Sequence, residues 1–272
     1  MRKQCVFGPI LSRRLGGSLG VNLVPYKTCN LDCVYCECGV TLNLSIERRE
    51  YLPTMAVIDA LQEAALRLQG FPPFCVTFAG WGEPTLHNQF GRIAEAARRI
   101  FPKERLVLIT NGTLFARFRE LLEEIQVFDL VIPSLDAGTE AVFQRINRPH
   151  PSLSFAEHLE SLALLRQHFP KDIWLEVFII EGLNDTPEEL LALRAHLDRL
   201  RPDRVHLNTL DRRPACAWVQ APSRERLEAI AHALGGEVIP PLQETRTFPH
   251  ATGHKLSGGQ QCAPRECHST PQ

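Results

Sequence analysis

Short apolar runs alternate with helix-patterned stretches along most of this chain, and this alternation constrains the fold more than any other feature. The apolar runs of strand length are 19–24, 74–79, 106–110, 130–134, 174–180 and 204–208. Between them apolar residues recur three and four positions apart, as they do at Leu190, Leu193, Leu197 and Leu200. Strands that are apolar almost throughout, each followed by a helix, predict a parallel sheet that is buried on both faces.

Polar residues follow each of these runs, at the point where a strand would end. They are Cys29, Gly82-Glu83-Pro84, Asn111, Ser134 and Asp136, then Glu181, Asn184 and Asp185, and finally Asn208, Thr209 and Asp211. Active sites lie at the carboxyl ends of the strands in both parallel barrels and open doubly wound sheets. A set drawn from every strand suits a barrel better, because an open sheet gathers its site at one switch point. We therefore expect an α/β fold of six units, a partial (β/α)6 barrel.

The last of the predicted helices carries a clear start signal. The run Thr186-Pro187-Glu188-Glu189 places a capping Thr before a Pro at the first helical position, with Glu three residues after the cap. This pattern predicts a capping box, in which the Thr and Glu side chains each satisfy a backbone N–H group.

Three closely spaced cysteines, Cys29, Cys33 and Cys36, form the strongest chemical motif. Three thiolates can hold three irons of a cubane cluster and leave the fourth iron open to a small molecule. Structural or zinc-bound thiols are the alternative, although a zinc site normally uses paired C-x₂-C knuckles. Cys262 and Cys267 offer ligands for a second metal site, but free thiols are the favoured interpretation there.

Composition indicates which partners and which cellular compartment suit this chain. The chain has 272 residues, with 30 Lys and Arg against 31 Asp and Glu, so its charge gives no support to a nucleic-acid partner. Its nine cysteines come without a secretory signal and without a long apolar run, which predicts a cytoplasmic protein that makes no use of a membrane. We expect a core at 1–240, with an extension over about residues 1–18, and an irregular tail at 241–272.

The cysteine spacing, with Tyr35 just before Cys36, resembles the radical S-adenosylmethionine (radical SAM) superfamily. Within it, the chain is similar to a subfamily often labelled wyosine-synthase-like. The segments that carry this similarity are 7–9, 12–16, 18–22, 82–87, 110–112, 133–138 and 146–149. The resemblance covers roughly residues 5–215, and it is informative about the family but weak about the substrate.

The resemblance implies a definite chemistry. Cys29, Cys33 and Cys36 would ligate a [4Fe–4S] cluster whose open iron is chelated by S-adenosylmethionine. One electron, from a donor such as flavodoxin or ferredoxin, would cleave the sulfonium to methionine and a 5′-deoxyadenosyl radical. That radical would abstract hydrogen from a tRNA base, a small metabolite or a protein side chain. The alternative is a non-catalytic iron–sulfur protein, an electron carrier or redox sensor.

The same resemblance assigns cofactor contacts to two motifs near the cluster. Tyr35 would lie beside the adenine, and Gly82, Glu83 and Pro84 would receive the methionine amino group. An electron carrier has no need of the second motif. Trp81 departs from the family pattern, in which the preceding residue is usually small, and so leaves the local pocket shape open.

Further contacts are implied after two later strands. Ser134 and Asp136 would bind the ribose hydroxyls or the methionine carboxylate, or else cap a loop. Asn111 is either a cofactor contact or a turn residue with positive φ. Four residues near the cysteines either bind an anionic substrate or, as we expect, have a solvated or structural role such as capping a barrel end. They are Ser12, Arg13, Arg14 and Lys27.

Overall fold

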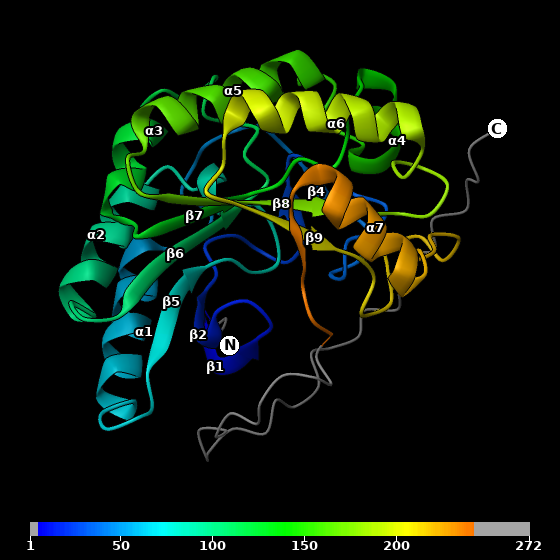
Figure 1. The fold of residues 1–272 in the computed structure, drawn as a ribbon. Coiled ribbons are helices and arrows are strands. Elements are labelled where there is room, and N and C mark those ends of the chain that lie inside the picture. The colour runs from blue at the N-terminus through cyan, green and yellow to red at the C-terminus, as the bar shows by residue number, and fades with distance from the viewer. Residues whose placement is uncertain (1–4, 242–272) are drawn as a thin grey trace.

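A mostly parallel sheet of eight strands forms the centre of the protein (Figure 1). The structure is a computed structural model, and it describes residues 5–241. In spatial order the strands are β1 (Val6–Ser12), β2 (Gly16–Val21), β5 (Phe74–Phe78), β6 (Arg105–Thr110), β7 (Leu130–Pro133), β8 (Asp172–Phe178), β9 (Arg204–Asn208) and β10 (Glu237–Val238). Only β1 runs antiparallel to its neighbour in this sheet.

The predicted α/β architecture is confirmed. The six predicted strands correspond to β2 and to β5 through β9, and all six are parallel. Within residues 5–241 no pairing joins β1 to β10, so the barrel is partial. Strand β2 begins and ends three residues earlier than the expected run 19–24. Leu23 and Val24 lie after its end, and they are buried there although they belong to no strand.

Helices connect the successive strands and lie over the outer face of the sheet (Figure 1). They are α1 (Thr54–Arg67), α2 (Phe90–Ile100), α3 (Leu121–Glu124), α4 (Glu140–Asn147), α5 (Phe155–His168), α6 (Pro187–Leu200) and α7 (Arg224–Leu234), with short 3₁₀ turns at Pro84–Leu86 and Ile125–Val127. Their apolar side chains join the sheet in one large core, in which Leu61, Ile93 and Leu193 are fully buried. This burial is the main stabilising term for the outer layer.

A second, smaller apolar cluster contains Val107, Leu130 and Ile132. Leu15, from the turn between β1 and β2, packs against it. The hairpin therefore does more than extend the sheet by an antiparallel edge strand, since its turn also supplies apolar contacts to β6 and β7.

The start of α6 agrees with the sequence in part. Thr186 caps the helix by accepting a hydrogen bond from the Glu189 N–H, and Pro187 is the first helical residue. The carboxylate of Glu189 does not complete the predicted capping box but accepts from the Gly138 N–H at 2.7 Å and from the Thr139 hydroxyl. Glu189 is buried, and it ties α6 to the loop after β7.

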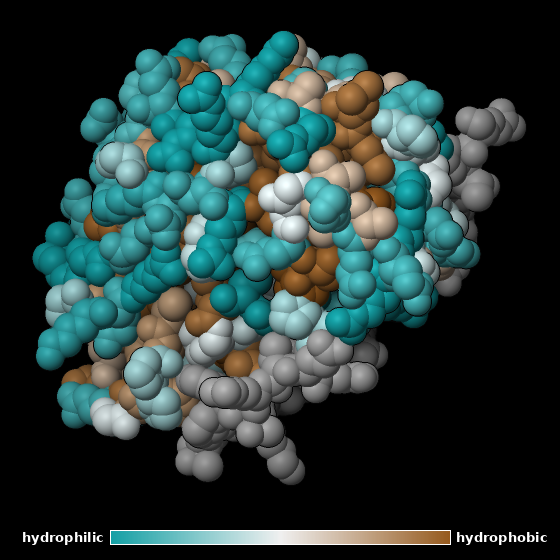
Figure 2. Space-filling view, in the orientation of Figure 1, coloured by the Kyte–Doolittle hydropathy of each residue, from teal (hydrophilic) through white to brown (hydrophobic). Residues whose placement is uncertain are grey.

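Polar side chains cover most of the face seen in Figure 2, and apolar side chains gather in a smaller area near its centre. Among the described helices, none is both long and apolar enough to cross a bilayer. The predicted irregular tail lies outside the described residues, except for residue 241.

Candidate active site

The cysteine loop follows β2, at the carboxyl edge of the sheet. Its first cysteine belongs to β3 (Thr28–Cys29), a two-residue strand that pairs in parallel with β4 (Asn43–Leu44). The end of α4 holds the loop in place, because the Asp32 N–H donates to the Asn147 carbonyl and the Val34 N–H to the Ile146 carbonyl, both at 2.9 Å. The loop thus satisfies carbonyl groups that a helix C-terminus would otherwise leave unpaired.

Each of the three predicted ligand sulfurs lies beside a nitrogen donor. The Leu31 N–H donates to Cys29 Sγ at 3.5 Å, and Asn147 Nδ2 donates to Cys33 Sγ at 3.5 Å. Lys27 Nζ lies 3.1 Å from Cys36 Sγ. Such donors stabilise negative charge on sulfur, so the loop suits three thiolate ligands.

Within residues 5–241 no group of three or more His, Cys, Asp or Glu side chains is arranged to hold one metal ion. A cubane cluster, unlike a zinc ion, takes each thiolate on a different iron, so its ligands can stand apart. Cysteine thiolates are the donors that hold iron–sulfur clusters, so the residue types of this loop fit such a cluster.

The thiols differ in their acidity. Burial raises the pKa of Cys29 to about 12 and raises the pKa of Cys33 well above its ordinary value. The hydrogen bond with Cys38 and the charge of Lys27 lower the pKa of Cys36. Of the three thiols, Cys36 is therefore the one whose surroundings most favour ionisation, and metal ligation by the other two would release protons.

Glu83 joins the loops that follow β5 and β6. Its Oε1 accepts hydrogen bonds from the N–H and hydroxyl of Thr85 and from the Thr110 hydroxyl, at 3.1, 2.6 and 2.6 Å, and its Oε2 accepts from the Asn111 N–H at 2.8 Å. Only 3% of Glu83 is exposed, and burial raises its pKa although these bonds oppose the rise. Because a carboxylate offers about four acceptor positions, the protein itself fills most of them.

Gly82 allows the loop after β5 to approach the cysteine loop closely. A Cβ atom at this position would lie 1.8 Å from the Thr28 carbonyl oxygen, and the next residue, Glu83, donates its N–H to that oxygen. Trp81, the departure from the family pattern, is 38% exposed, and its ring contacts that of Tyr26. The indole therefore lies at the surface of this loop.

Tyr35 and Asp136 lie together and connect the cysteine loop to β8. The Tyr35 hydroxyl donates to Asp136 Oδ2 at 2.6 Å, and its ring stacks on Phe178 with centroids 3.9 Å apart. Asp136 also accepts from Asn147 Nδ2 at 2.8 Å and from the Phe178 N–H at 2.9 Å. Burial raises the pKa of Asp136 to about 6. Burial and the nearby Asp136 raise the pKa of Tyr35, so it stays a neutral donor.

Asn111 and Ser134 lie on neighbouring loops. Asn111 makes a turn by accepting from the Thr113 N–H at 3.1 Å, and its Nδ2 donates to Asn30 Oδ1 at 2.6 Å. The alternative of a positive φ at Asn111 is wrong, because Gly112 takes that conformation, with φ of 75°. Ser134 is half-buried at the end of β7, where it bridges to Glu176 on β8.

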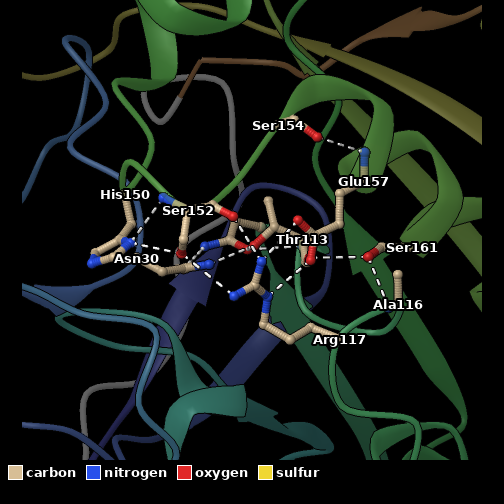
Figure 3. Close-up of polar contacts among 10 residues, drawn as sticks. Asn30, Thr113, Ala116, Arg117, His150, Ser152, Ser154, Glu157 and Ser161 are labelled. Atoms are coloured by element: carbon tan, nitrogen blue, oxygen red, sulfur yellow. Dashed lines mark hydrogen bonds and ion pairs between the residues drawn. The ribbon is translucent and has the colours of Figure 1, made fainter.

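A polar network runs outward from Asn30, between two of the cysteines (Figure 3). Asn30 is fully buried, its side chain donates to the Thr113 hydroxyl, and its carbonyl accepts from the His150 N–H at 2.9 Å. Ser161 on α5 in turn donates to the Thr113 carbonyl at 2.9 Å. The cysteine loop is thereby fixed to the loops that follow β6 and α4.

Other predicted residues have structural partners. Asn184 is buried and binds backbone groups of Asp136, Phe178 and Ile180. Arg14 forms an ion pair with Glu176, and Asn208 Nδ2 donates to the same carboxylate at 3.3 Å.

Further residues complete the comparison with the sequence. Of the roles open to Lys27, the structure favours the structural one over solvent exposure or substrate binding, because the residue is 3% exposed and lies against Cys36. Asn147 was not singled out as a site residue, since no spacing rule connects it to the cysteines. Cys262 and Cys267 lie outside the described residues.

Comparison with known proteins gives a family match over this region. The model described as "Radical SAM superfamily" matches residues 23–194, which include the cysteine loop and most of the strands. A UPF0026 protein of Methanocaldococcus jannaschii is 34% identical over 234 residues, which are 86% of this chain and 71% of that protein.

Two further matches differ in reach. A protein of Brachyspira hyodysenteriae named GTPase Obg is 35% identical over 84% of this chain, but this chain spans only 33% of that protein. A solved structure of TYW1 with a lysine–pyruvate adduct bound has a TM-score of 0.57, with 16% identity over 80% of this chain and 72% of that one. At this identity the likeness shows the fold alone.

Proposed function

Because this chain belongs to the radical SAM superfamily, whose enzymes use a [4Fe–4S] cluster and S-adenosylmethionine, we propose that Cys29, Cys33 and Cys36 hold the cluster. We propose further that the protein is a radical SAM enzyme acting on a substrate still to be identified. When bound, the two cofactors supply reductive cleavage of the sulfonium and a 5′-deoxyadenosyl radical that abstracts hydrogen from the substrate.

The arrangement of donors around the three sulfurs is the main support for the ligand assignment. These donors come from three separate places, the backbone of Leu31, the end of α4 at Asn147, and Lys27 ahead of the loop. Three thiolates packed together repel one another, and donors on each of them offset that repulsion. Thiols without a ligand have no need of such a set.

The chain's own residues have distinct tasks in this proposal. Tyr35, stacked on Phe178, would present the edge of its ring to the adenine. Asp136 holds the Tyr35 hydroxyl, and through Asn147 it is connected to Cys33. Glu83 keeps the loops after β5 and β6 together, so backbone groups of Gly82 and Pro84 would receive the methionine amino group. Oε2 of Glu83 has one hydrogen bond, from the Asn111 N–H, and would have acceptor capacity for the same group.

The substrate class stays open among a tRNA base, a small metabolite and a protein side chain. The nearly neutral charge, with 30 basic and 31 acidic residues, does not favour RNA. We propose a cytoplasmic enzyme whose core spans 1–240, with an electron donor of the flavodoxin or ferredoxin kind.

The test is a titration with S-adenosylmethionine. The protein is reconstituted anaerobically with iron and sulfide and reduced with dithionite, and the electron paramagnetic resonance (EPR) spectrum of the cluster is followed as the cofactor is added. A saturable change in the signal is expected, because the cofactor binds the open iron. A spectrum that ignores the cofactor would contradict the proposal and favour an electron carrier or redox sensor.

A further inference from the structure

Lys27 places a positive charge inside the cysteine loop. Its side chain is almost fully buried, at 3% exposed, and Nζ lies 3.1 Å from Cys36 Sγ. The position is fixed by the backbone, because the Lys27 N–H donates to the Trp81 carbonyl at 2.9 Å, and the Lys27 carbonyl accepts from the N–H groups of Leu42 and Asn43 at 3.0 Å. The ammonium group therefore has little freedom to leave the sulfur.

The backbone of Lys27 is itself unusual. Its φ is 55°, in the left-handed region that a residue with a side chain seldom adopts. A residue with a Cβ atom is strained in this conformation, whereas glycine adopts it freely. A lysine kept in this conformation points to a task for its side chain.

The hydrogen bonds to the other two sulfurs, those of Cys29 and Cys33, come from uncharged donors. Cys33 has the Asn147 amide at 3.5 Å, and Cys29 has the Leu31 N–H at 3.5 Å and the Asn111 amide at 3.8 Å. Among these contacts within the described part of the chain, Lys27 alone brings a full charge. Its effect on the cluster should exceed that of any single neutral donor.

We propose that Lys27 sets the reduction potential of the cluster by holding its ammonium group against Cys36. This inference rests on the proposed function, since it requires Cys36 to be a cluster ligand. The step concerned is the transfer of one electron from an external reductant to the oxidised cluster, and no bond forms or breaks at Lys27. A reduced cluster carries one more negative charge, so a buried cation beside it favours the reduced state and raises the potential.

The experiment is a potentiometric titration of the reconstituted protein, followed by EPR. In Lys27→Met the charge is lost while an unbranched side chain only one atom shorter is kept, so the ratio of reduced to oxidised cluster at a fixed potential should fall at least tenfold, a negative shift of 59 mV or more for a one-electron couple. In Lys27→Arg the potential should stay near that of the wild type. Lys103→Met, at an exposed lysine, is the matched control and should change nothing.

A loaded Lys27→Met protein with the wild-type potential would overturn the inference. So would a normal potential with weakened binding of S-adenosylmethionine, which would place the ammonium on the cofactor instead. If Lys27→Met takes up no iron, Lys27→Gln provides the measurement, because its amide can still donate to sulfur without a charge. Failure of both variants to load while Lys27→Arg loads would give Lys27 a structural task only and overturn the tuning role.

The titration also separates this inference from the proposed function. If wild-type protein gives no cluster signal that responds to S-adenosylmethionine, the proposed function fails before any variant is made. If the wild type responds and the variant potentials do not differ, the inference about Lys27 alone fails.

Discussion

The two ends of the parallel strands use charged residues in opposite ways. At the amino ends, Arg105 pairs with Asp172 at 3.0 Å and Arg166 with Asp203 at 2.8 Å, and the carboxylates of these pairs are about half exposed. At the carboxyl ends the carboxylates of Glu83 and Asp136 are almost fully buried, and neutral hydroxyl, amide and backbone groups surround them. The same residue types therefore serve as surface ion pairs at one end and as a buried network at the other.

The free-energy cost of a charged side chain differs between the two ends of the strands. Exposed ion pairs contribute about 0–1 kcal/mol each, so the amino ends lose little when one is removed. A buried carboxylate is costly unless its oxygens are bonded, and the surrounding groups are left unpaired when it is taken away. The buried carboxylates at the carboxyl ends are therefore better explained by the site whose loops they hold in position than by a gain in the free energy of unfolding.

The largest expected difference between the two ends of the parallel strands comes from replacing one cysteine at each end with alanine. Cys33→Ala should abolish the cluster and all activity, because it removes a ligand, while Cys75→Ala on β5 should keep both. Cys75 is partly buried, packs against the second apolar cluster, and donates a weak hydrogen bond to the Leu15 carbonyl at 3.9 Å. Iron and sulfide content and the visible absorption of the reconstituted proteins measure the effect. A full [4Fe–4S] spectrum in Cys33→Ala would remove it from the ligand set.

Removing a carboxylate from each end sharpens the comparison further. Glu83→Ala leaves four hydrogen-bond donors without their acceptor, so we expect a loss of about 3 kcal/mol of stability, against less than about 1 kcal/mol for Asp172→Ala. Affinity for S-adenosylmethionine should fall about tenfold or more in Glu83→Ala, with iron content intact.

Urea unfolding and cofactor titration measure these two effects of Glu83→Ala. Equal losses of stability in the Glu83 and Asp172 variants would contradict the contrast between the two ends. An unchanged affinity in Glu83→Ala would remove Glu83 from the cofactor pocket.

His158 on α5 gives a smaller effect, which depends on pH. The side chain is 4% exposed, and neither ring nitrogen makes a hydrogen bond of ordinary geometry to the described residues. Burial lowers its pKa from 6.5 to about 4, so the unfolded chain binds the proton more readily, and stability is lost as the pH falls through this range. Between pH 7 and pH 5 this loss is about 2 kcal/mol.

Two leucine variants on α5 test this pH effect, one at His158 and one, as a control, at His168. His158→Leu should lack this part of the pH dependence, whereas His168→Leu, at an exposed position, should keep it. Free energies of unfolding at the two pH values decide between them. The same pH dependence in His158→Leu as in the wild type would show that another group carries it.

The sequence predicted the strands well and the contacts of the site poorly, for physical reasons. A buried parallel strand must be apolar almost throughout, so the runs that became β5 to β9 were visible without tertiary information. The edge strands β1 and β10 were missed because strands at an edge need no continuous apolar run. The spacing of Cys29, Cys33 and Cys36 identified the loop, since these proposed cluster ligands lie close together along the chain.

The donors around those cysteines depend on contacts that spacing cannot express. Asn147 reaches Cys33 across 114 positions, and Asn111 reaches Cys29 across 82. Lys27 was visible as a nearby base, but its burial depends on the loop being folded back over it, which the pattern of polar residues does not reveal. The residue types at the site were predictable, and their partners were not.

Formation of 5′-deoxyadenosine is the direct sign that this protein is a radical SAM enzyme. Wild-type protein, reconstituted anaerobically and reduced with dithionite, is incubated with S-adenosylmethionine beside Cys33→Ala and Cys75→Ala. Slow formation of 5′-deoxyadenosine and methionine by the wild type and Cys75→Ala, and none by Cys33→Ala, is the predicted result. A loaded wild-type cluster that forms no 5′-deoxyadenosine, and whose EPR signal ignores S-adenosylmethionine, would contradict the account of this protein as a radical SAM enzyme.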